Sequence, residues 1–347
     1  MADPILAITL GDPAGIGPEI ALKAAASLGP DLRRRGHSLL ILGDAATLTE
    51  TARALDLPLP PMVEEADLAR MPRAGILPTR DDGPAFRPGE LSAEAGDQAY
   101  RAVATATRLA MEGRVAALVT GPLNKEALNL AGHAYAGHTE MLADLTGVRD
   151  SAMMLAHGDF RVSHVSTHCA LEEVPRKATR ERIHRVIDLT AETLRHLGIA
   201  RPRIAVAALN PHAGEGGIFG RHDIDVTEPL VQDLRRKGLD VTGPVPGDTV
   251  FVKMRGGAFD AVIAMYHDQG HIPVKLLGFS VDRESGRWTG LSGVNVTLGL
   301  PIIRTSVDHG TAFDIAGQGI AEATSLIEAI DYALSLARPE VAERAAS

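Results

Sequence analysis

The chain alternates short apolar runs with amphipathic segments, and this alternation constrains its fold more than any other feature. Patterns typical of buried strands occur at 5–10, 37–43, 115–122, 160–168, 203–214 and 259–270. Helical patterns with one apolar face occur at 18–28, 96–113, 178–198 and 321–337. Strands that alternate with helices form a mostly parallel sheet covered by helices on both faces. The sequence therefore predicts an α/β fold.

The length of the chain limits the number of its domains. At 347 residues it can bury one large core or fold as two lobes. Two irregular stretches interrupt the alternation. Residues 57–89 are rich in proline and acidic side chains, and we expect a surface excursion there. Residues 280–293 hold the only tryptophan, Trp288, and we expect an exposed loop.

Composition excludes several classes of protein. A net charge of -9 argues against a nucleic-acid partner held by overall charge. No segment approaches the ~20 consecutive apolar residues of a membrane span, and the N-terminus lacks a secretory signal pattern, so we expect no membrane partner. Cys169 is the single cysteine, which excludes an intramolecular disulfide and a cysteine-rich zinc site and favours a reducing, cytoplasmic location.

Polar turns follow several of the predicted strands, with the sequences TGPLNK, STHCALEE, LNPHAGEGG and YHDQGH. Ligands of open α/β sheets bind beside the carboxyl ends of the strands, so a site is expected at these turns. His168, His212 and His267 occupy matching places after their strands. A lone histidine in such a place is more often an ordinary hydrogen-bonded residue, but three favour a shared divalent metal.

The turn sequence YHDQGH also carries His271, four residues after His267. This is the spacing of a zinc-binding pair on one face of a helix. Gly270 and Pro273 argue against a helix here, and the chain contains no HExxH sequence. We therefore expect a turn at this position and reject that type of zinc site.

The segment GDPAGIGPE joins the first predicted strand to the first predicted helix. Its residues Gly11, Gly15 and Gly17 suit an anionic or nucleotide ligand at a helix N-terminus, and with Asp12 they are our candidate cofactor-binding residues. The spacing is not GxGxxG, so the dinucleotide-binding fingerprint is not met. A tight turn that needs glycine explains the segment equally well.

Several residues are candidates for binding a phosphate or a carboxylate. Arginine offers such an oxyanion a planar fork, and lysine offers a point charge. The candidates are His138, Thr139, Lys275, Asn295 and Arg304, of which the first two lie at a predicted helix start. Taken singly, each is more often a structural or solvated residue.

Three residues are candidate general acids or bases. Asp248, Asp268 and Lys275 could act beside a metal, although an aspartate equally often caps a turn. Cys169 follows His168 directly, but nothing nearby marks it as a nucleophile, and we expect it to be inert.

Eight of these segments, in order, resemble the motifs of the 4-hydroxythreonine-4-phosphate dehydrogenase family, the pyridoxine-biosynthesis enzyme PdxA and its relatives. They are ITLGDPAGIGPEI, TGPLNKEAL, GHTEMLA, VSTHCALEEV, LNPHAGEGGIFG, GDTVF, MYHDQGHIPVK and GVNVTLGLPIIRTSVDHGTAFDIAG. The resemblance covers nearly the whole chain. It implies an isocitrate/isopropylmalate-dehydrogenase-like fold of two α/β lobes with the site in the cleft between them. We place the lobes at 1–125 plus 295–347 and at 126–294.

The resemblance also implies the chemistry. It implies a homodimer, with NAD or NADP as hydride acceptor and one divalent metal (Zn, Mg or Co) in a site shared between subunits. By motif match, His168, His212 and His267 fall on the metal ligands. Substrate and phosphate contacts fall on His138, Thr139, Lys275, Asn295 and Arg304. In the implied reaction the metal lowers the pKa of the substrate hydroxyl, and the carbon that bears this hydroxyl is oxidised. The resulting β-keto acid then loses CO2.

The sequence departs from the vitamin-pathway pattern in two places. His271 and Ile272 give HDQGHIPVKLL, which is similar to relatives that oxidise D-threonate or D-erythronate 4-phosphate, or aromatic cis-dihydrodiols. The segment 280–293 is also longer than expected. The family name favours 4-phosphohydroxy-L-threonine as substrate, whereas the HDQGHIP variant favours the sugar-acid phosphates. The complete phosphate-binding set disfavours the dihydrodiols.

Two hypotheses of other classes use the same fold. A non-catalytic metabolite-binding protein has no need of three metal-binding histidines, and neither has a phosphoryl- or acyltransferase. We therefore expect an oxidative decarboxylase of a phosphorylated 3-hydroxy acid. Its leading substrate is 4-phosphohydroxy-L-threonine, and D-threonate or D-erythronate 4-phosphate is the alternative.

Overall fold

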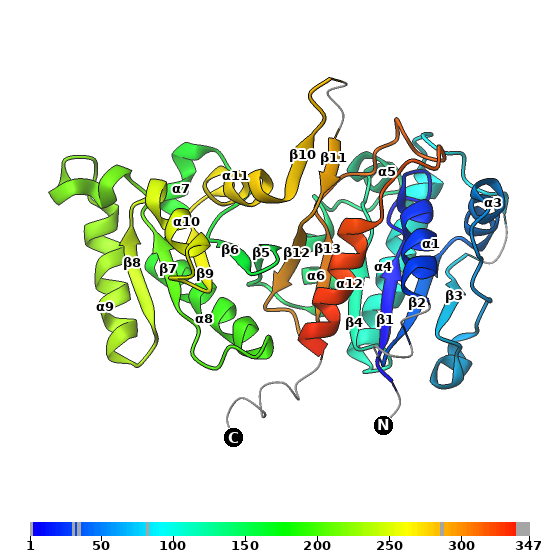
Figure 1. Ribbon diagram of the computed structural model, residues 1–347, viewed down its shortest axis with the longest axis horizontal. Coiled ribbons are helices and arrows are strands. Elements are labelled where there is room, and N and C mark those ends of the chain that lie inside the picture. The colour runs from blue at the N-terminus through cyan, green and yellow to red at the C-terminus, as the bar shows by residue number, and fades with distance from the viewer. Residues whose placement is uncertain (1–2, 30–31, 33–35, 81–82, 285–287, 338–347) are drawn as a thin grey trace. The chain divides into compact units, whose positions relative to one another are not determined.

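The computed structural model describes residues 3–29, 32, 36–80, 83–284 and 288–337 (Figure 1). The chain divides into two compact units: unit 1 is Met1–Ser151 with Leu300–Ala337, and unit 2 is Ala152–Gly299. The division falls after Ser151, later than the expected 125/126. Residues 338–347, which we expected in the first lobe, lie outside the described residues. Both units contain the alternating strands and helices that the sequence predicted.

Unit 1 is built on a parallel sheet. In spatial order its strands are β3 (Ala74–Pro78), β2 (Ser38–Gly43), β1 (Ile5–Thr9), β4 (Ala117–Thr120) and β13 (Arg304–Val307). Every residue of β2 and of β4 is buried, because helices cover both faces of the sheet. One face packs Ala7 and Leu40 against α4 (Ala93–Met111), while α12 (Thr324–Ala337, red in Figure 1) packs on β4 and β13.

Unit 2 is built on a mixed sheet. In spatial order its strands are β12 (Val294–Leu298), β5 (Ala152–His157), β6 (Phe160–His164), β9 (Ala261–Ala264), β7 (Ile204–Ala207) and β8 (Val241–Val245). The strands from β6 to β8 are parallel, whereas β5 runs antiparallel to both of its neighbours. Gly158, with φ of +55°, lies in the tight turn between β5 and β6. The predicted parallel arrangement is thus confirmed for the β6–β8 part of this sheet.

Helices occupy the positions between the strands. The others of unit 1 are α1 (Gly17–Leu28), α3 (Ala45–Leu55), α5 (Lys125–Leu130), α6 (His138–Thr146) and the 3-10 turn η1 (Glu65–Arg70). Those of unit 2 are η2 (Leu171–Glu173), α7 (Val174–Lys177), α8 (Arg180–His196), η3 (Pro211–Gly217), η4 (Asp223–Thr227), α9 (Glu228–Arg236), α10 (Gly247–Arg255) and α11 (His267–Gly278). Polar side chains cap several starts: Asp44 accepts from Thr47 N–H at α3, and Ser92 from Ala95 N–H at α4. No helix in the described ranges has the length and apolar character needed to cross a membrane.

The expected turn after residue 266 was wrong, because α11 begins at His267 and runs to Gly278. Pro273 lies inside this helix, and packing of the buried helix face offsets its cost of about 3 kcal/mol. Gly270 serves close packing and not a turn: a Cβ there would lie 2.3 Å from His164 Nε2. The glycine lets α11 lie directly on β6 and β9.

The two stretches that we expected to be irregular contain regular structure. Within 280–293, β10 (Phe279–Val281) pairs with β11 (Trp288–Leu291) in an antiparallel hairpin, and residues 285–287 lie outside the described part. Trp288 is exposed, as predicted. Within 57–89, η1 and the edge strand β3 are ordered elements, and residues 81–82 are not described. These elements are only three to six residues long, which is too short for a periodic pattern to stand out.

Candidate functional site

The carboxyl ends of the parallel strands in unit 2 carry four of the predicted site residues. Strands β6, β9, β7 and β8 lie side by side in that order and run in the same direction. His168 follows β6, His267 follows β9, His212 follows β7 and Asp248 follows β8. The fold therefore brings these residues to one edge of the sheet, where open α/β sheets bind ligands.

The rings of His168 and His267 approach each other at this edge. Their centroids are 6.0 Å apart and their planes are inclined by 40°. Two imidazoles on one tetrahedral zinc have centroids on the order of 5 Å apart, given Zn–N distances of about 2.0 Å. A small adjustment would let this pair share an ion. Among the residues that the structure describes, no three metal-binding side chains are grouped closely enough to hold one, so His212 is not assembled with the pair.

His267 is oriented by its neighbour in sequence. Its Nδ1 lies 2.7 Å from Asp268 Oδ1. Because a carboxylate only accepts hydrogen bonds, Nδ1 carries the proton, and Nε2 has its lone pair available for a metal. A carboxylate behind a metal-binding histidine fixes the tautomer and the orientation of its ring. The contact favours an orienting role for Asp268 over the acid–base role that we expected.

One face of α11 carries His267, His271 and Lys275, each four residues from the next. The ring of His271 stacks on His267 with centroids 3.6 Å apart, and its Nδ1 donates to the His267 carbonyl at 3.0 Å. Burial is the main cause that lowers the pKa of His271 to about 4, so the ring is neutral at pH 7. From the sequence we used His271 only as a variant that favours the sugar-acid phosphates, and we did not place it among the site residues. Its four-residue spacing from His267 could have indicated that the two rings lie on one face of a helix, but we expected a turn there and did not use this spacing.

His212 lies on a strained turn, η3. The φ angles of His212, Ala213 and Glu215 are +52°, +55° and +40°, in the left-handed region that costs non-glycine residues about 1–2 kcal/mol each. Asp223, which is fully buried, holds the start of this turn. Its carboxylate accepts from two consecutive backbone N–H groups and from the Asn210 amide, at 2.7–2.9 Å. The buried carboxylate of Asp223 thus holds the turn that carries His212 in its strained shape.

Arg304 is the central cation of the predicted anion site in unit 1. It begins β13, is 3% exposed, and donates from Nη2 to Thr120 Oγ1 at 2.7 Å, where β4 ends. Burial lowers the pKa of Arg304 to about 9, which still leaves the guanidinium charged at pH 7. A cation so poorly hydrated gains free energy from any anion that reaches it. Thr120 was not among the residues that we singled out.

His138 and Thr139 begin α6, which confirms the predicted helix start. The preceding residue, Gly137, has no side chain to cap the helix, so N–H groups of the first turn remain for a ligand or solvent. Burial, with a smaller effect of the Arg304 charge, holds the pKa of His138 well below its usual range. Its Nε2 is buried and has no hydrogen-bond partner among the residues that the structure describes. A neutral histidine, a buried arginine and a helix N-terminus together suit phosphate oxygens.

The other two predicted substrate contacts belong to unit 2. Asn295 lies on β12 opposite Leu155 of β5, and its buried Oδ1 has no hydrogen-bond partner within the described part of the chain. The Lys275 ammonium lies 5.0 Å from the centre of the Phe279 ring. The predicted set is therefore divided, with His138, Thr139 and Arg304 in unit 1.

Packing within unit 1 explains the three glycines of the GDPAGIGPE segment. A Cβ on Gly11 would lie 2.1 Å from the Pro122 carbonyl oxygen, and one on Gly17 would lie 1.8 Å from that of Leu10. A Cβ on Gly15 would lie 2.9 Å from a backbone oxygen. Gly11 also has φ of +72°. These contacts account for the glycines without a ligand and favour the tight-turn explanation.

Asp12 is the polar residue of this segment that packing does not explain. It is 1% exposed, and its Oδ1 accepts from Ala14 N–H at 2.9 Å, while Oδ2 has no hydrogen-bond partner in the ranges that the structure describes. Burial raises the pKa of Asp12 to about 6. A carboxyl group in this setting can donate a hydrogen bond when it is protonated.

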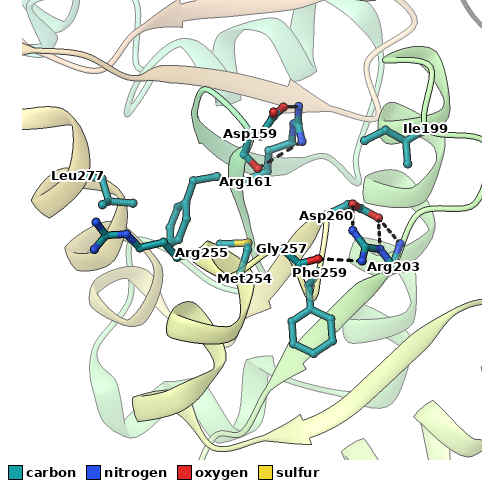
Figure 2. Close-up of a pocket in the computed structure, with 11 residues that line it drawn as sticks. Asp159, Arg161, Ile199, Arg203, Met254, Arg255, Gly257, Phe259, Asp260 and Leu277 are labelled. Atoms are coloured by element: carbon teal, nitrogen blue, oxygen red, sulfur yellow. Dashed lines mark hydrogen bonds and ion pairs between the residues drawn. The ribbon is translucent and has the colours of Figure 1, made fainter.

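A cavity of about 510 Å³ lies at the opposite edge of the unit 2 sheet (Figure 2). Figure 2 shows that its charged lining is largely paired: Arg161 with Asp159 at 2.5 Å, and Arg203 with Asp260 at 2.7 Å. These residues stand at the amino ends of β6, β7 and β9. Because ligands of such sheets bind at the carboxyl ends, we assign this cavity no catalytic role.

Comparison with known proteins identifies relatives along nearly the whole chain. Residues 35–333 match the profile of the family described as pyridoxal phosphate biosynthetic protein PdxA. A Bradyrhizobium diazoefficiens protein, provisionally named D-threonate 4-phosphate dehydrogenase, is 62% identical over 334 residues, 96% of either chain. A Beijerinckia indica protein named 4-hydroxythreonine-4-phosphate dehydrogenase is 44% identical over 98% of this chain and 97% of its own. The crystal structure of a Klebsiella pneumoniae protein of that name is 45% identical, with a TM-score of 0.81 over 96% of this chain and 98% of its own.

Proposed function

Because the chain belongs to the family of the pyridoxal phosphate biosynthetic protein PdxA, we propose that it is a dehydrogenase that oxidises and decarboxylates a phosphorylated four-carbon hydroxy acid. One observation carries the proposal: the chain has both a histidine-bearing strand edge in unit 2 and a buried arginine–histidine pair in unit 1. The first suits a metal and the second suits a phosphate.

D-Threonate 4-phosphate is the leading substrate, which reverses the order that the family name suggested. The relative at 62% identity carries that substrate in its name, and the HDQGHIP sequence is similar to that branch. 4-Phosphohydroxy-L-threonine is the second candidate, because it is the substrate named for the relative at 44% identity.

His168, His212 and His267 would hold the divalent metal, with ligands from both subunits of a homodimer completing the set. Three imidazoles suit zinc or cobalt better than magnesium, which prefers oxygen ligands. When bound, the metal would lower the pKa of the substrate hydroxyl and polarise the new carbonyl. Asp268 keeps the proton on His267 Nδ1, so Nε2 would be the nitrogen available to the metal.

Two further residues would move protons. Asp248 is exposed at the start of α10, at the same sheet edge as the histidines, where its carboxylate can take the hydroxyl proton. Lys275 lies two turns from His267 on the same face of α11, and its Nζ can return a proton to the carbon that loses CO2.

The phosphate would be held by residues far from the reacting carbon. The Arg304 fork and the N–H groups at Thr139 donate to its oxygens, and His138 Nε2 bonds to one of them if the proton is on that nitrogen. Asn295, on β12 of unit 2, remains a candidate substrate contact. Binding energy gained at the phosphate orients the hydroxyl carbon for reaction.

NAD, or NADP, would accept the hydride when bound. Our candidate binding residues remain Gly11, Asp12, Gly15 and Gly17. A cavity of about 140 Å³ adjoins their segment in unit 1, and its lining includes Pro13, Gly15, Thr47, Phe86 and Gly317. The glycine turn thereby shapes one wall of a cavity, which supports the assignment even though packing alone explains the glycines.

An exposed apolar patch supports the homodimer. Ile272 and Leu276, on α11, are 56% and 76% exposed, and Val281 and Trp288, paired in the neighbouring hairpin, are 46% and 63% exposed. Apolar side chains this exposed on adjoining elements are typical of a protein interface. Cys169, the single cysteine, suits a reducing cytoplasm.

Turnover by purified protein tests the proposal. NADH formation would be followed with NAD and Co²⁺ for D-threonate 4-phosphate, D-erythronate 4-phosphate and 4-phosphohydroxy-L-threonine. We expect the highest kcat/KM for D-threonate 4-phosphate. A higher value for 4-phosphohydroxy-L-threonine would establish the second candidate instead. No turnover of any of the three by metal-loaded protein would refute the proposal and favour a dihydrodiol substrate or a non-catalytic role.

A further inference from the structure

Three hydrogen bonds run across the strand ends of unit 2, next to the candidate metal ligands. Ser166 Oγ donates to the Met265 carbonyl at 2.7 Å, which ties the end of β6 to the end of β9. Gln269 Oε1 accepts from Met265 N–H at 2.7 Å, and Gln269 Nε2 donates to the Ala208 carbonyl at 2.8 Å. These bonds tie α11 and β9 to β7. We call Ser166, Met265, Gln269 and Ala208 the strand-end brace.

The brace attaches close to every candidate metal ligand. Its members lie two residues before His168, two before His267 and four before His212. Met265 is 0% exposed and Ala208 1% exposed, so water cannot replace the bonds to their peptide groups. Any loss of these bonds therefore shifts the backbone that leads into a histidine.

Gln269 is the only member of the brace that uses both polar atoms of a side chain. Its amide must turn oxygen toward Met265 N–H and nitrogen toward the Ala208 carbonyl, which fixes its orientation. Little free space surrounds it, since a Cβ on Gly247 would lie 3.2 Å from Nε2. Glutamate would keep the acceptor but would turn an oxygen toward the Ala208 carbonyl.

We propose that the strand-end brace, with Gln269 at its centre, holds the backbone that leads into His168, His212 and His267 and thereby supports metal binding by these residues. The inference rests on the proposed role of these histidines as ligands. A functional site must be held within about 0.5 Å of its working geometry, and loss of groups that orient metal ligands costs roughly 10–100-fold in affinity. A glutamine that served only the fold would change stability and leave metal affinity unaltered.

Co²⁺ binding to the full-length protein tests the proposal, because the visible absorption of bound cobalt reports both affinity and ligand geometry. Gln269→Glu alters one atom of the amide. Gln269→Met removes both polar atoms without adding charge. Gln232→Glu, at an exposed glutamine of α9, is the matched control. We expect both Gln269 variants to bind Co²⁺ about 10–100-fold more weakly, with an altered spectrum, and the control to match the wild type.

The outcomes separate the brace from the metal site. If both Gln269 variants bind Co²⁺ within twofold of wild type while His212→Ala loses binding, the brace is refuted and the metal site stands. If the wild type binds no Co²⁺, or His212→Ala binds as tightly as wild type, the metal site fails and the brace fails with it. If neither Gln269 variant folds, Ser166→Ala decides: weaker Co²⁺ binding supports the brace, and unchanged binding overturns it.

Discussion

Replacement of Arg304 by methionine should stabilise the free protein and abolish its response to phosphate. Burial lowers the pKa of Arg304 from 12.5 to about 9, which at about 1.36 kcal/mol per pKa unit corresponds to about 5 kcal/mol of unfavourable charge burial at pH 7. The charge on Arg304 destabilises the folded state because the unfolded chain holds this proton more tightly than the folded chain does. The cost is present at every pH below 9 and disappears as the pH rises from 9 to 12.5.

The variant loses part of the stability that it gains by removal of the buried charge. Thr120 Oγ1 loses the hydrogen bond from Arg304 Nη2, which costs about 1–3 kcal/mol. Methionine fills much of the vacated volume. We therefore expect Arg304→Met to raise the free energy of unfolding by about 2–4 kcal/mol, and the melting temperature by several degrees. In the wild type, inorganic phosphate at ten times its Kd should add about 1.4 kcal/mol of stability, and in the variant none.

Thermal unfolding with and without inorganic phosphate measures both effects. Arg101→Met is the matched control, because Arg101 also belongs to unit 1 but is 59% exposed, in an ion pair with Asp97. This control should change stability by at most about 0.5 kcal/mol and keep the phosphate response. A lower stability of Arg304→Met than of the wild type would contradict a large cost of charge burial, and an equal stabilisation by phosphate would exclude Arg304 from the phosphate site.

Three other substitutions test separate parts of the account. Asp12→Asn should stabilise the protein by up to about 3 kcal/mol at pH 8, and this gain should shrink as the pH falls toward 4. The reason is that the pKa of Asp12 is raised to about 6, so the buried carboxyl group is charged, and costly, only at higher pH. Melting curves that show an equal gain at pH 8 and pH 4 would contradict this prediction. Asp223→Asn should weaken Co²⁺ binding at least tenfold while Asp225→Asn, at an exposed carboxylate, does not; equal affinities measured by titration would sink the role of Asp223. Leu276→Asp should give monomers in light scattering, and a dimer would exclude the apolar patch as the interface.

The strand and helix order could be predicted because each element has a strong local signal. The amphipathic pattern at 178–198 became α8, and the apolar runs at 5–10 and 37–43 became β1 and β2. The placement of the histidines at one sheet edge followed as well, since parallel strands end at the same edge.

The helix α11 could not be predicted, since the reason for its glycine lies elsewhere in the chain. Gly270 has no Cβ because β6 brings His164 Nε2 to within 2.3 Å of where that atom would be. Without this neighbour in view, Gly270 and Pro273 indicate a turn. That error also hid the stacking of His271 on His267.

The contacts that orient the site could not be predicted from the sequence either. Gln269 bonds to a carbonyl 61 residues away, and Arg304 to a hydroxyl 184 residues away. Asp223 reaches across 13 residues to the strained turn of His212. Nothing in local composition marks such partners, because each depends on which strands become neighbours.

The most direct test of the central claim is the rate of NADH formation from D-threonate 4-phosphate before and after removal of metal. Protein stripped by a chelator should lose turnover, and Co²⁺ should restore it in the wild type but not in His267→Ala, whose fold is checked by its melting temperature. Undiminished turnover by the stripped protein, or full recovery in His267→Ala, would contradict the assignment of the histidine edge as the metal site of a dehydrogenase.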